Sequence, residues 1–267
     1  MTSVVIVTFY SAATIESCLC SVLDHAGPRA DITVVDNGSK DGTCEIVTVF
    51  ASRESRLKFL RNDENLGYSR ALNIGLRAAK GDTLVCLNPD TEVTKGWLEP
   101  LEAALQLPDV GAVGPVSDTV GGAQFLGHYA NKQLPDKGGI ARWMGRHYRG
   151  QTEETKLLIG FCAAFKREVI EKVGMMDEDL FLGADDLDYS WRLRQAGYRL
   201  LVCKDAFVHH EGGVSFASLP SDRKAELVRQ SDLALRRKLE AHYGDLSRIT
   251  SDYLFGCDIF EHILREG

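Results

Sequence analysis

Residues 3–87 alternate short apolar runs with segments in which apolar residues recur at helical spacing. The apolar runs are 3–9 (SVVIVTF), 31–36 (DITVVD), 57–61 and 83–87. A continuous apolar run is typical of a strand that is buried on both faces of a parallel sheet. Regular alternation of such strands with helices predicts an α/β protein whose parallel strands are joined by right-handed crossovers.

The regular alternation fades after about residue 116. Residues 117–155 are rich in glycine and poor in apolar clusters, so we expect a long loop, which in a compact domain is usually a binding segment. On either side of this loop, apolar spacing predicts the remaining elements. We expect helices at 12–25, 43–51, 67–80, 185–196, 221–243 and 250–265, and strands at 157–166 and 199–208.

The composition excludes some classes of function. The chain has 267 residues, of which 44% are hydrophobic, and this is enough to bury a sizeable core. The 31 Lys and Arg residues against 38 Asp and Glu give a formal net charge of −7. An acidic chain is a poor partner for nucleic acid, because neutralisation of phosphates dominates that affinity. We therefore expect no nucleic-acid partner.

Cysteine usage and the N-terminal run predict a soluble, cytoplasmic protein. Several of the seven cysteines fall inside apolar runs, which is typical of reduced, buried thiols and not of a thiolate metal site. The first run has no basic segment before it and no cleavage site after it, so we expect no signal peptide. No uninterrupted apolar run is long enough for a transmembrane helix, which needs about 18 residues.

Polar residues follow each of the first four predicted strands, at 8–10, 36–39, 62–67 and 88–90. Ligands of open parallel sheets bind at the carboxyl ends of the strands, so these segments are expected to converge on one ligand. The alternative is ordinary turn formation, which Asn, Asp and Gly favour in any case.

Asp90 is the strongest candidate for a metal ligand. The chain has no GxGxxG after its first strand and no GxxxxGK[ST], so a bound nucleotide would need another group to neutralise its diphosphate. A divalent cation such as Mg²⁺ or Mn²⁺ prefers oxygen ligands, and Asp90, with Asn88 beside it, follows a buried strand. A role as a helix cap or turn residue remains the alternative for Asp90.

Three acids, Asp185, Asp186 and Asp188, open the predicted helix 185–196. Negative charge at a helix N-terminus is favourable in itself, which is the structural alternative. Adjacent carboxylates repel each other, however, and this raises the pKa of one of them and makes a general base plausible. We predict Asp186 as the base, Asp185 as its neighbour, and Asp188 as an anchor of the helix through an arginine pair.

His209 and His210 end an apolar strand and precede two glycines. Adjacent side chains of a strand point to opposite faces, so we expect only one of these imidazoles to face a metal. A surface or core position for both remains the alternative.

Five segments in this order resemble the family 2 glycosyltransferases, and more specifically their rhamnosyltransferase-like members, in which the NPD form of the metal motif is typical. The resemblance covers about residues 3–216, and any one segment alone would be weak. The segments are VVIVTFYSAATIESCLCSVL, ITVVDNGSKDGT, NDENLGYSRALNIGLRAAKGD, LVCLNPDTEV and GFCAAFKREVIEKVGMMDEDLFLGADDLDYSWRLRQAGYRL.

The resemblance implies a GT-A fold: a Rossmann-like, mostly parallel sheet with helices on both faces, a smaller mixed sheet for the acceptor, and C-terminal helices. The GT-A domain would span 1–216, with a nucleotide-sugar half at 1–92 and an acceptor half at 93–216. Residues 217–267 would form a helical extension. The segment 117–155 is then expected to shape the acceptor site.

The resemblance also implies a role for each matching residue. Asp90 would hold Mn²⁺ or Mg²⁺ together with His209 or His210, Asp186 would be the catalytic base, and Asp185 would contact the substrate. The donor would be bound by residues of the first half, namely Thr8, Phe9, Tyr10, Asp36, Asn65, Gly67, Arg70 and Asn88.

Two positions depart from the family pattern. Asn88 stands where the first acid of the DxD motif is usual, which weakens the case for metal dependence. Asp185 stands where a Glu usually precedes the catalytic Asp, and its side chain is one methylene shorter. The contact with the acceptor is therefore expected to differ.

The resemblance implies an inverting glycosyltransferase of cell-surface glycan synthesis. Its donor would be dTDP-rhamnose or a UDP-sugar, and its acceptor a saccharide or a lipid-linked hydroxyl, with peripheral contact at the inner face of the membrane. A nucleotidyltransferase acting on sugar phosphates is an alternative, although a Gly-rich basic loop would be expected where TFYSAAT stands. A non-catalytic nucleotide-sugar-binding partner is another, although Asp90 and Asp186 are both present.

Overall fold

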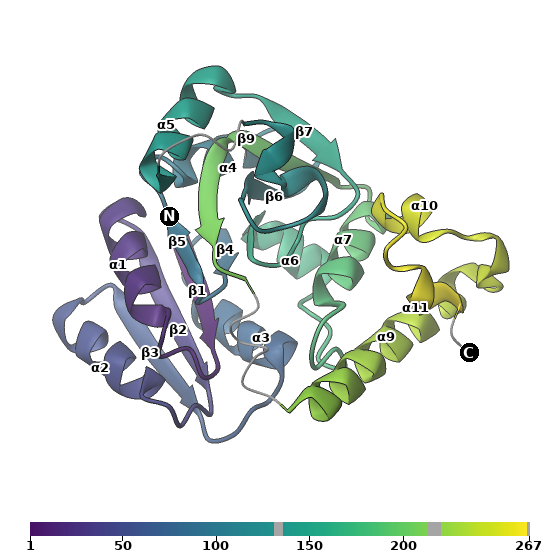
Figure 1. The fold of residues 1–267 in the computed structure, drawn as a ribbon, viewed down its shortest axis with the longest axis horizontal. Coiled ribbons are helices and arrows are strands. Elements are labelled where there is room, and N and C mark those ends of the chain that lie inside the picture. The colour runs from purple at the N-terminus through teal and green to yellow at the C-terminus, as the bar shows by residue number, and fades with distance from the viewer. Residues whose placement is uncertain (131–135, 213–219, 266–267) are drawn as a thin grey trace.

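A nine-stranded sheet runs through the computed structural model, which describes residues 1–130, 136–212 and 220–265 (Figure 1). The strand order is β3-β2-β1-β4-β8-β6-β9-β5, and β7 pairs with β9 at the side. The strands are β1 (Thr2–Thr8), β2 (Asp31–Asn37), β3 (Leu57–Asn62), β4 (Thr83–Leu87), β5 (Thr91–Val93), β6 (Val110–Val116), β7 (Thr152–Thr155), β8 (Cys162–Lys166) and β9 (Arg199–His210).

The first four strands form the predicted parallel half of the sheet. β1 lies between β2 and β4, and β2 pairs with β3, all in parallel. The register sets Thr8 beside Asp36 and Asn37 beside Asn62, so the polar strand ends lie at the same edge. β8 then pairs antiparallel with both β4 and β6, which makes the second half mixed and continuous with the first.

Helices cover both faces of the sheet, as predicted. Val4 and Ile6 of β1 join an apolar cluster with α1, α2 and α4, whereas Val5 and Val7 join a second one with α3, α5 and α6. This alternation follows from the two-residue period of a strand. The helices are α1 (Ile15–His25), α2 (Thr43–Arg53), α3 (Tyr68–Ala78), α4 (Leu98–Leu105), α5 (Lys137–His147), α6 (Arg167–Val173), α7 (Asp185–Gln195), α9 (Ser221–Tyr243), α10 (Ser251–Phe255) and α11 (Glu261–Arg265).

The prediction of a long loop at 117–155 is wrong for most of the described part of that segment. It contains two 3₁₀ helices, η1 (Gly122–Gln124) and η2 (Leu126–His128), followed by α5 and β7. Three glycines weaken the helical signal of α5, since each costs about 1 kcal/mol relative to alanine. Tertiary packing overrides that cost, because Met144 is fully buried.

Other boundaries differ from the predictions in smaller ways. Only the last five residues of the strand predicted at 157–166 form β8, and the helix predicted at 250–265 is two short helices. The break falls at Gly256, whose φ of 78° lies in the left-handed region that ends helices. The strands β5 and β6 and the helices α4 and α6 were not predicted.

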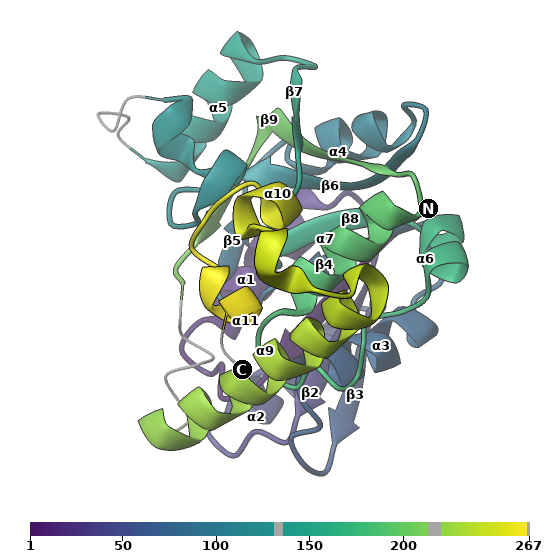
Figure 2. The same cartoon turned by 90° about the vertical axis from the view of Figure 1, so that its right-hand side faces the viewer.

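The C-terminal helices pack against α7 (Figure 2). Leu235 and Leu239 of α9 share an apolar cluster with Leu187 and Trp191 of α7. A further 3₁₀ helix, η3 (Leu246–Arg248), follows α9. Within the described residues, no helix combines the length and the apolar character that a bilayer crossing requires. The predicted division of the chain at residue 216 lies outside the described residues and stays a prediction.

Candidate active site

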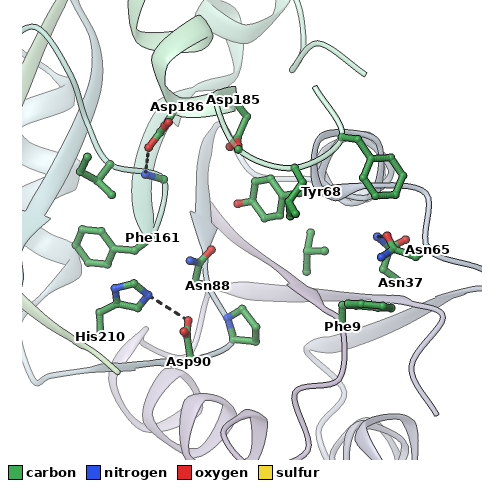
Figure 3. A pocket seen from close by; sticks show the side chains of 17 residues that line it. Phe9, Asn37, Asn65, Tyr68, Asn88, Asp90, Phe161, Asp185, Asp186 and His210 are labelled. Carbon is green, nitrogen blue, oxygen red and sulfur yellow. Dashed lines mark hydrogen bonds and ion pairs between the residues drawn. The ribbon is translucent and has the colours of Figure 1, made fainter. Parts of the chain in front are cut away.

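A cavity of about 250 Å³ opens at the carboxyl ends of β1, β2 and β4 (Figure 3). Each of the four polar strand-end segments contributes a side chain to it, namely Phe9, Asn37, Asn65 and Asn88. The facing wall comes from the residues before β8 and from those that lead into α7. The predicted convergence of the strand ends on one site is therefore confirmed.

Asp90 and His210 meet at one end of the cavity. Antiparallel pairing of β5 with β9 sets Thr91 opposite His210, so the neighbouring Asp90 lies against the imidazole. Asp90 Oδ1 is 3.2 Å from His210 Nε2, and the His210 ring stacks on Phe161 with centroids 5.3 Å apart. His210, and not His209, faces Asp90 (Figure 3).

The Asp90–His210 pair fits a divalent cation. Asp90 Oδ1 and both His210 ring nitrogens are buried, and none has a hydrogen bond of good geometry among the described residues. The described residues contain no cluster of three or more His, Cys, Asp and Glu that would complete a shell. Such a cation would take its other ligands from substrate and water.

His209 points away from Asp90, as strand alternation predicts. Its Nδ1 lies 2.6 Å from Asp118 Oδ2, and the backbone N–H of His210 donates to Asp118 Oδ1 at 3.3 Å. Burial raises the pKa of Asp118, but the hydrogen bond from His209 and its charge outweigh burial and hold the pKa of Asp118 below its usual range. Asp118 thus secures the end of β9. Nothing in the sequence indicated this residue.

The carboxylates of Asp185 and Asp186 lie on the facing wall, at the first turn of α7 (Figure 3). Asp186 Oδ1 accepts from the backbone N–H of Leu187 at 2.9 Å, and its Oδ2 accepts from that of Gly160 at 3.2 Å. Ala184, just before the pair, has a left-handed φ of 61°. The Asp186 carboxylate is thus held by the residue two positions before β8 and by the first turn of α7.

The environment raises the pKa of both acids. Burial is the main cause for each, and the neighbouring charge of Asp186 adds to it for Asp185, whose pKa rises to about 7. The two backbone N–H groups on Asp186 favour its charged form and partly oppose the effect of burial. Asp188 pairs with Arg192 at 2.8 Å, so its predicted role as an anchor of α7 is confirmed.

Thr8 and Asp36 are fully buried beneath the cavity and do not line it. The Asp36 carboxylate accepts from Thr8 Oγ1 at 3.0 Å and from the backbone N–H groups of Gly38 and Ser39 at 3.1 and 2.9 Å. Its contacts in this structure therefore hold the turn after β2. A direct contact of Asp36 with the donor stays a prediction.

Phe9 and Tyr10 differ in their placement. The Phe9 ring lines the cavity, whereas Tyr10 packs edge-on against it with centroids 4.8 Å apart. Tyr10 has a φ of 51°, and its backbone N–H donates to Ser39 Oγ at 2.9 Å. The turn after β1 is thereby tied to the turn after β2.

Asn65, Gly67 and Arg70 also take different places. Asn65 lines the cavity and accepts the Gly67 N–H at 2.9 Å. Gly67 has a φ of 84°, and a Cβ there would lie 2.8 Å from the Phe181 ring, so no larger residue fits. Arg70 lies outside the cavity, 57% exposed, with its Nε 3.6 Å from Glu178.

Several lining residues were not predicted as site residues. Asn37 Nδ2 donates to Asn65 Oδ1 at 2.8 Å, and Tyr68 lies close to the acidic pair (Figure 3). Both stand within the segments that carry the family resemblance, which is the signal that points to them. Phe161 and Phe181 also stand within a segment that carries the resemblance, but nothing in the sequence distinguishes them from core aromatic residues, so only the tertiary structure shows that their rings reach the cavity.

This sheet, with its strand-end cavity, has the GT-A fold of glycosyltransferases. GalNAc-T7, solved with UDP, GalNAc and Mn²⁺, superposes with a TM-score of 0.66 at 20% identity, over 95% of this chain and 52% of that one. The mannosyltransferase PcManGT from Pyrobaculum calidifontis, solved with GDP-Man and Mn²⁺, superposes with a TM-score of 0.60 at 24% identity. The superposition covers 91% of this chain and 75% of that one.

The chain belongs to glycosyl transferase family 2, whose model matches residues 3–174. Glycosyltransferase AglE of Haloferax volcanii is 29% identical over 217 residues, which are 78% of this chain and 66% of AglE. The N-acetylglucosaminyl-diphospho-decaprenol L-rhamnosyltransferase of Mycobacterium tuberculosis is 27% identical over 250 residues, with 83% and 80% covered. The chain thus spans just under two thirds of AglE and about half of GalNAc-T7.

Proposed function

We propose that the chain is an inverting glycosyltransferase that moves a sugar from a nucleoside-diphosphate donor to an acceptor hydroxyl. One observation carries the proposal: a single cavity has the Asp90–His210 pair at one end and the Asp185–Asp186 pair on the facing wall. Direct displacement needs charge neutralisation on the leaving diphosphate and a base for the incoming hydroxyl. The two pairs supply these on opposite sides.

Asp90 and His210 would hold Mg²⁺ or Mn²⁺. The bound cation would neutralise the negative charge that develops on the departing diphosphate. Asn88 lines the cavity beside them and offers an uncharged oxygen, so the chain itself contributes one carboxylate to this end. His209 would act indirectly, because it contacts Asp118 and not the cavity.

Asp186 would accept the proton of the acceptor hydroxyl while the hydroxyl oxygen attacks the anomeric carbon of the donor sugar. The N–H groups of Gly160 and Leu187 fix the carboxylate and favour its charged form, which a base must have before it reacts. Asp185, with its raised pKa, would contact the acceptor as a hydrogen-bonding neighbour. The attack from the face opposite the leaving group inverts the anomeric configuration.

The donor's nucleoside would lie along the strand ends. Phe9 offers a ring for stacking, and Asn65 offers polar contacts. Thr8 and Asp36 would support this pocket from below and would reach a base only by exchanging their present partners. Arg70 would need to leave Glu178 to reach the diphosphate.

For the donor we favour dTDP-rhamnose or a UDP-sugar, and for the acceptor a lipid-linked or polymeric saccharide of cell-surface glycan synthesis. The NPD form of the metal motif and the similarity to a decaprenol-linked rhamnosyltransferase support this choice. A lipid-linked acceptor would bring the chain to the membrane surface from the cytoplasmic side.

Calorimetry with UDP, dTDP and GDP, each with and without Mn²⁺, tests the proposal and selects the nucleotide. Release of that nucleoside diphosphate from its sugar conjugates is then measured with candidate acceptors. We expect tighter binding with Mn²⁺ and turnover that forms a glycoside. Release of pyrophosphate from a nucleoside triphosphate would indicate a nucleotidyltransferase, and tight binding without turnover would indicate a non-catalytic partner.

A further inference from the structure

Helix α9 contacts the chain on both sides of the acidic pair. Before the pair, the buried Ser231 hydroxyl accepts the backbone N–H of Leu182 at 3.1 Å, and Leu182 lines the cavity. After the pair, Lys238 Nζ forms an ion pair with Asp188, whose side chain is 1% exposed. Both contacts come from one face of α9, since the two residues are seven positions apart.

Lys238 ties two parts of the acidic wall together. Its Nζ lies 2.7 Å from Asp177 Oδ2 as well as against Asp188, and Asp188 in turn pairs with Arg192 at 2.8 Å. Burial raises the pKa of Asp177, but the Lys238 charge and hydrogen bonding outweigh this and lower it overall. The start of α7 and the loop that leads to it are therefore held to α9 as one unit.

The backbone between these two contacts is strained. Ala184 caps α7 at a φ of 61°, a region that residues other than glycine rarely adopt. Such a conformation persists only where the surroundings over-determine it. The contacts of Ser231 with Leu182 and of Lys238 with Asp188 lie on either side of Ala184.

Through these contacts, helix α9 holds the Asp185–Asp186 wall of the cavity and not the Asp90–His210 end. The Asp90–His210 end is built by the pairing of β5 with β9 and by the Phe161 ring. We propose that Ser231 and Lys238 are positioning residues, which hold the Asp185–Asp186 wall at the distance that transfer requires without taking part in donor binding. This inference rests on the proposed transferase function.

Three substitutions and a matched control on the same helix test the inference. Ser231→Ala removes the acceptor for the Leu182 N–H, Lys238→Met removes the charge, and Lys238→Arg retains it. Tyr243→Phe is the control, because the Tyr243 hydroxyl accepts hydrogen bonds from Trp191 and Gln195 near the far end of α7. Each variant is measured for kcat, donor KM, Mn²⁺-dependent affinity for the selected nucleoside diphosphate, and Tm.

We expect Ser231→Ala and Lys238→Met to lower kcat by about 10-fold or more, because a shift of about 1 Å in a catalytic group can cost about 100-fold. Nucleotide affinity and donor KM should stay within about twofold. Lys238→Arg should keep about a third or more of the parental kcat, and Tyr243→Phe should keep nearly all of it.

The positioning role is overturned if Ser231→Ala and Lys238→Met both keep kcat within twofold of the parent. It is also overturned if Tyr243→Phe lowers kcat and Tm as much as these two variants do. Equal losses in nucleotide affinity and kcat would also overturn it, since they would show a general structural effect. If the parent protein binds none of the nucleotides and turns over no nucleotide sugar, the proposed function fails instead.

Discussion

Replacing Asp186 by Asn tests the proposed role of Asp186 as the base, because the amide keeps the shape of the carboxylate but cannot take up a proton. Loss of a general base typically lowers the rate about 10²–10⁴-fold. At about 1.4 kcal/mol per tenfold change, this raises the barrier by about 3–5 kcal/mol. Donor binding should be retained, because the Asp90–His210 pair is on the other side of the cavity.

The same substitution has a structural cost that the geometry defines. Both Asp186 oxygens accept backbone N–H groups, at 2.9 Å from Leu187 and 3.2 Å from Gly160. An Asn side chain has one oxygen, so one of these N–H groups loses its partner, at about 1–3 kcal/mol. A domain of ordinary stability, about 5–15 kcal/mol, stays folded under such a loss.

The assay follows release of the nucleoside diphosphate from the donor selected with the parent protein, and calorimetry measures the affinity for the nucleotide. Activity is measured well below the Tm of the variant, so that unfolding does not contribute. A rate within threefold of the parent would refute Asp186 as the base. In that case Asp185, which faces the same cavity, would be the next candidate.

Three further predictions concern the two ends of the cavity. Asp90→Ala should weaken Mn²⁺-dependent binding of the nucleoside diphosphate by about 10-fold or more and leave the free nucleoside unaffected; equal losses in calorimetry would make Asp90 structural. Asp118→Ala should weaken the same binding by about 10-fold, because Asp118 secures the strand that carries His210; an unchanged affinity would refute this role. Asp185→Asn should raise Tm relative to the parent protein, and thermal melts should show that this gain grows from about pH 4 to about pH 7 and is constant above about pH 7. A folded pKa of about 7 against a usual 3.8 means that the folded parent binds more protons in this range, so its stability falls as pH rises; a Tm gain that shrinks over this range would contradict the shifted pKa.

The sequence predicted the parallel half well because its signals are local. The run 83–87 is predicted as a strand with the bounds that β4 has. Outside the parallel half, the helix predicted at 221–243 matches α9 for the same reason. Apolar periodicity and turn residues act within a few positions, so they can be recognised without the tertiary structure. The convergence of four polar strand ends followed from the rule that parallel strands end at one edge.

The antiparallel half was harder to predict because its elements depend on distant partners. β5 has three residues, and its pairing with β9 joins positions more than a hundred residues apart. That pairing brings His210 to Asp90, so the prediction that one of two histidines faces the site could not say which one. Asp118 shows the same limit, since its partner His209 lies 91 positions away.

The cavity arises where the two halves of the sheet meet, and each half supplies chemistry that the other lacks. The strand ends of the parallel half bring Asp90 and the polar residues around Asn88, whereas the antiparallel entry of β8 beside β4 brings Gly160 next to Asp186. Because β9 then returns along β6 to pair with β5, the imidazole of His210 reaches the parallel half again. The proposed base and the proposed cation site are therefore held by different elements, so we expect substitutions to affect proton transfer and nucleotide binding separately.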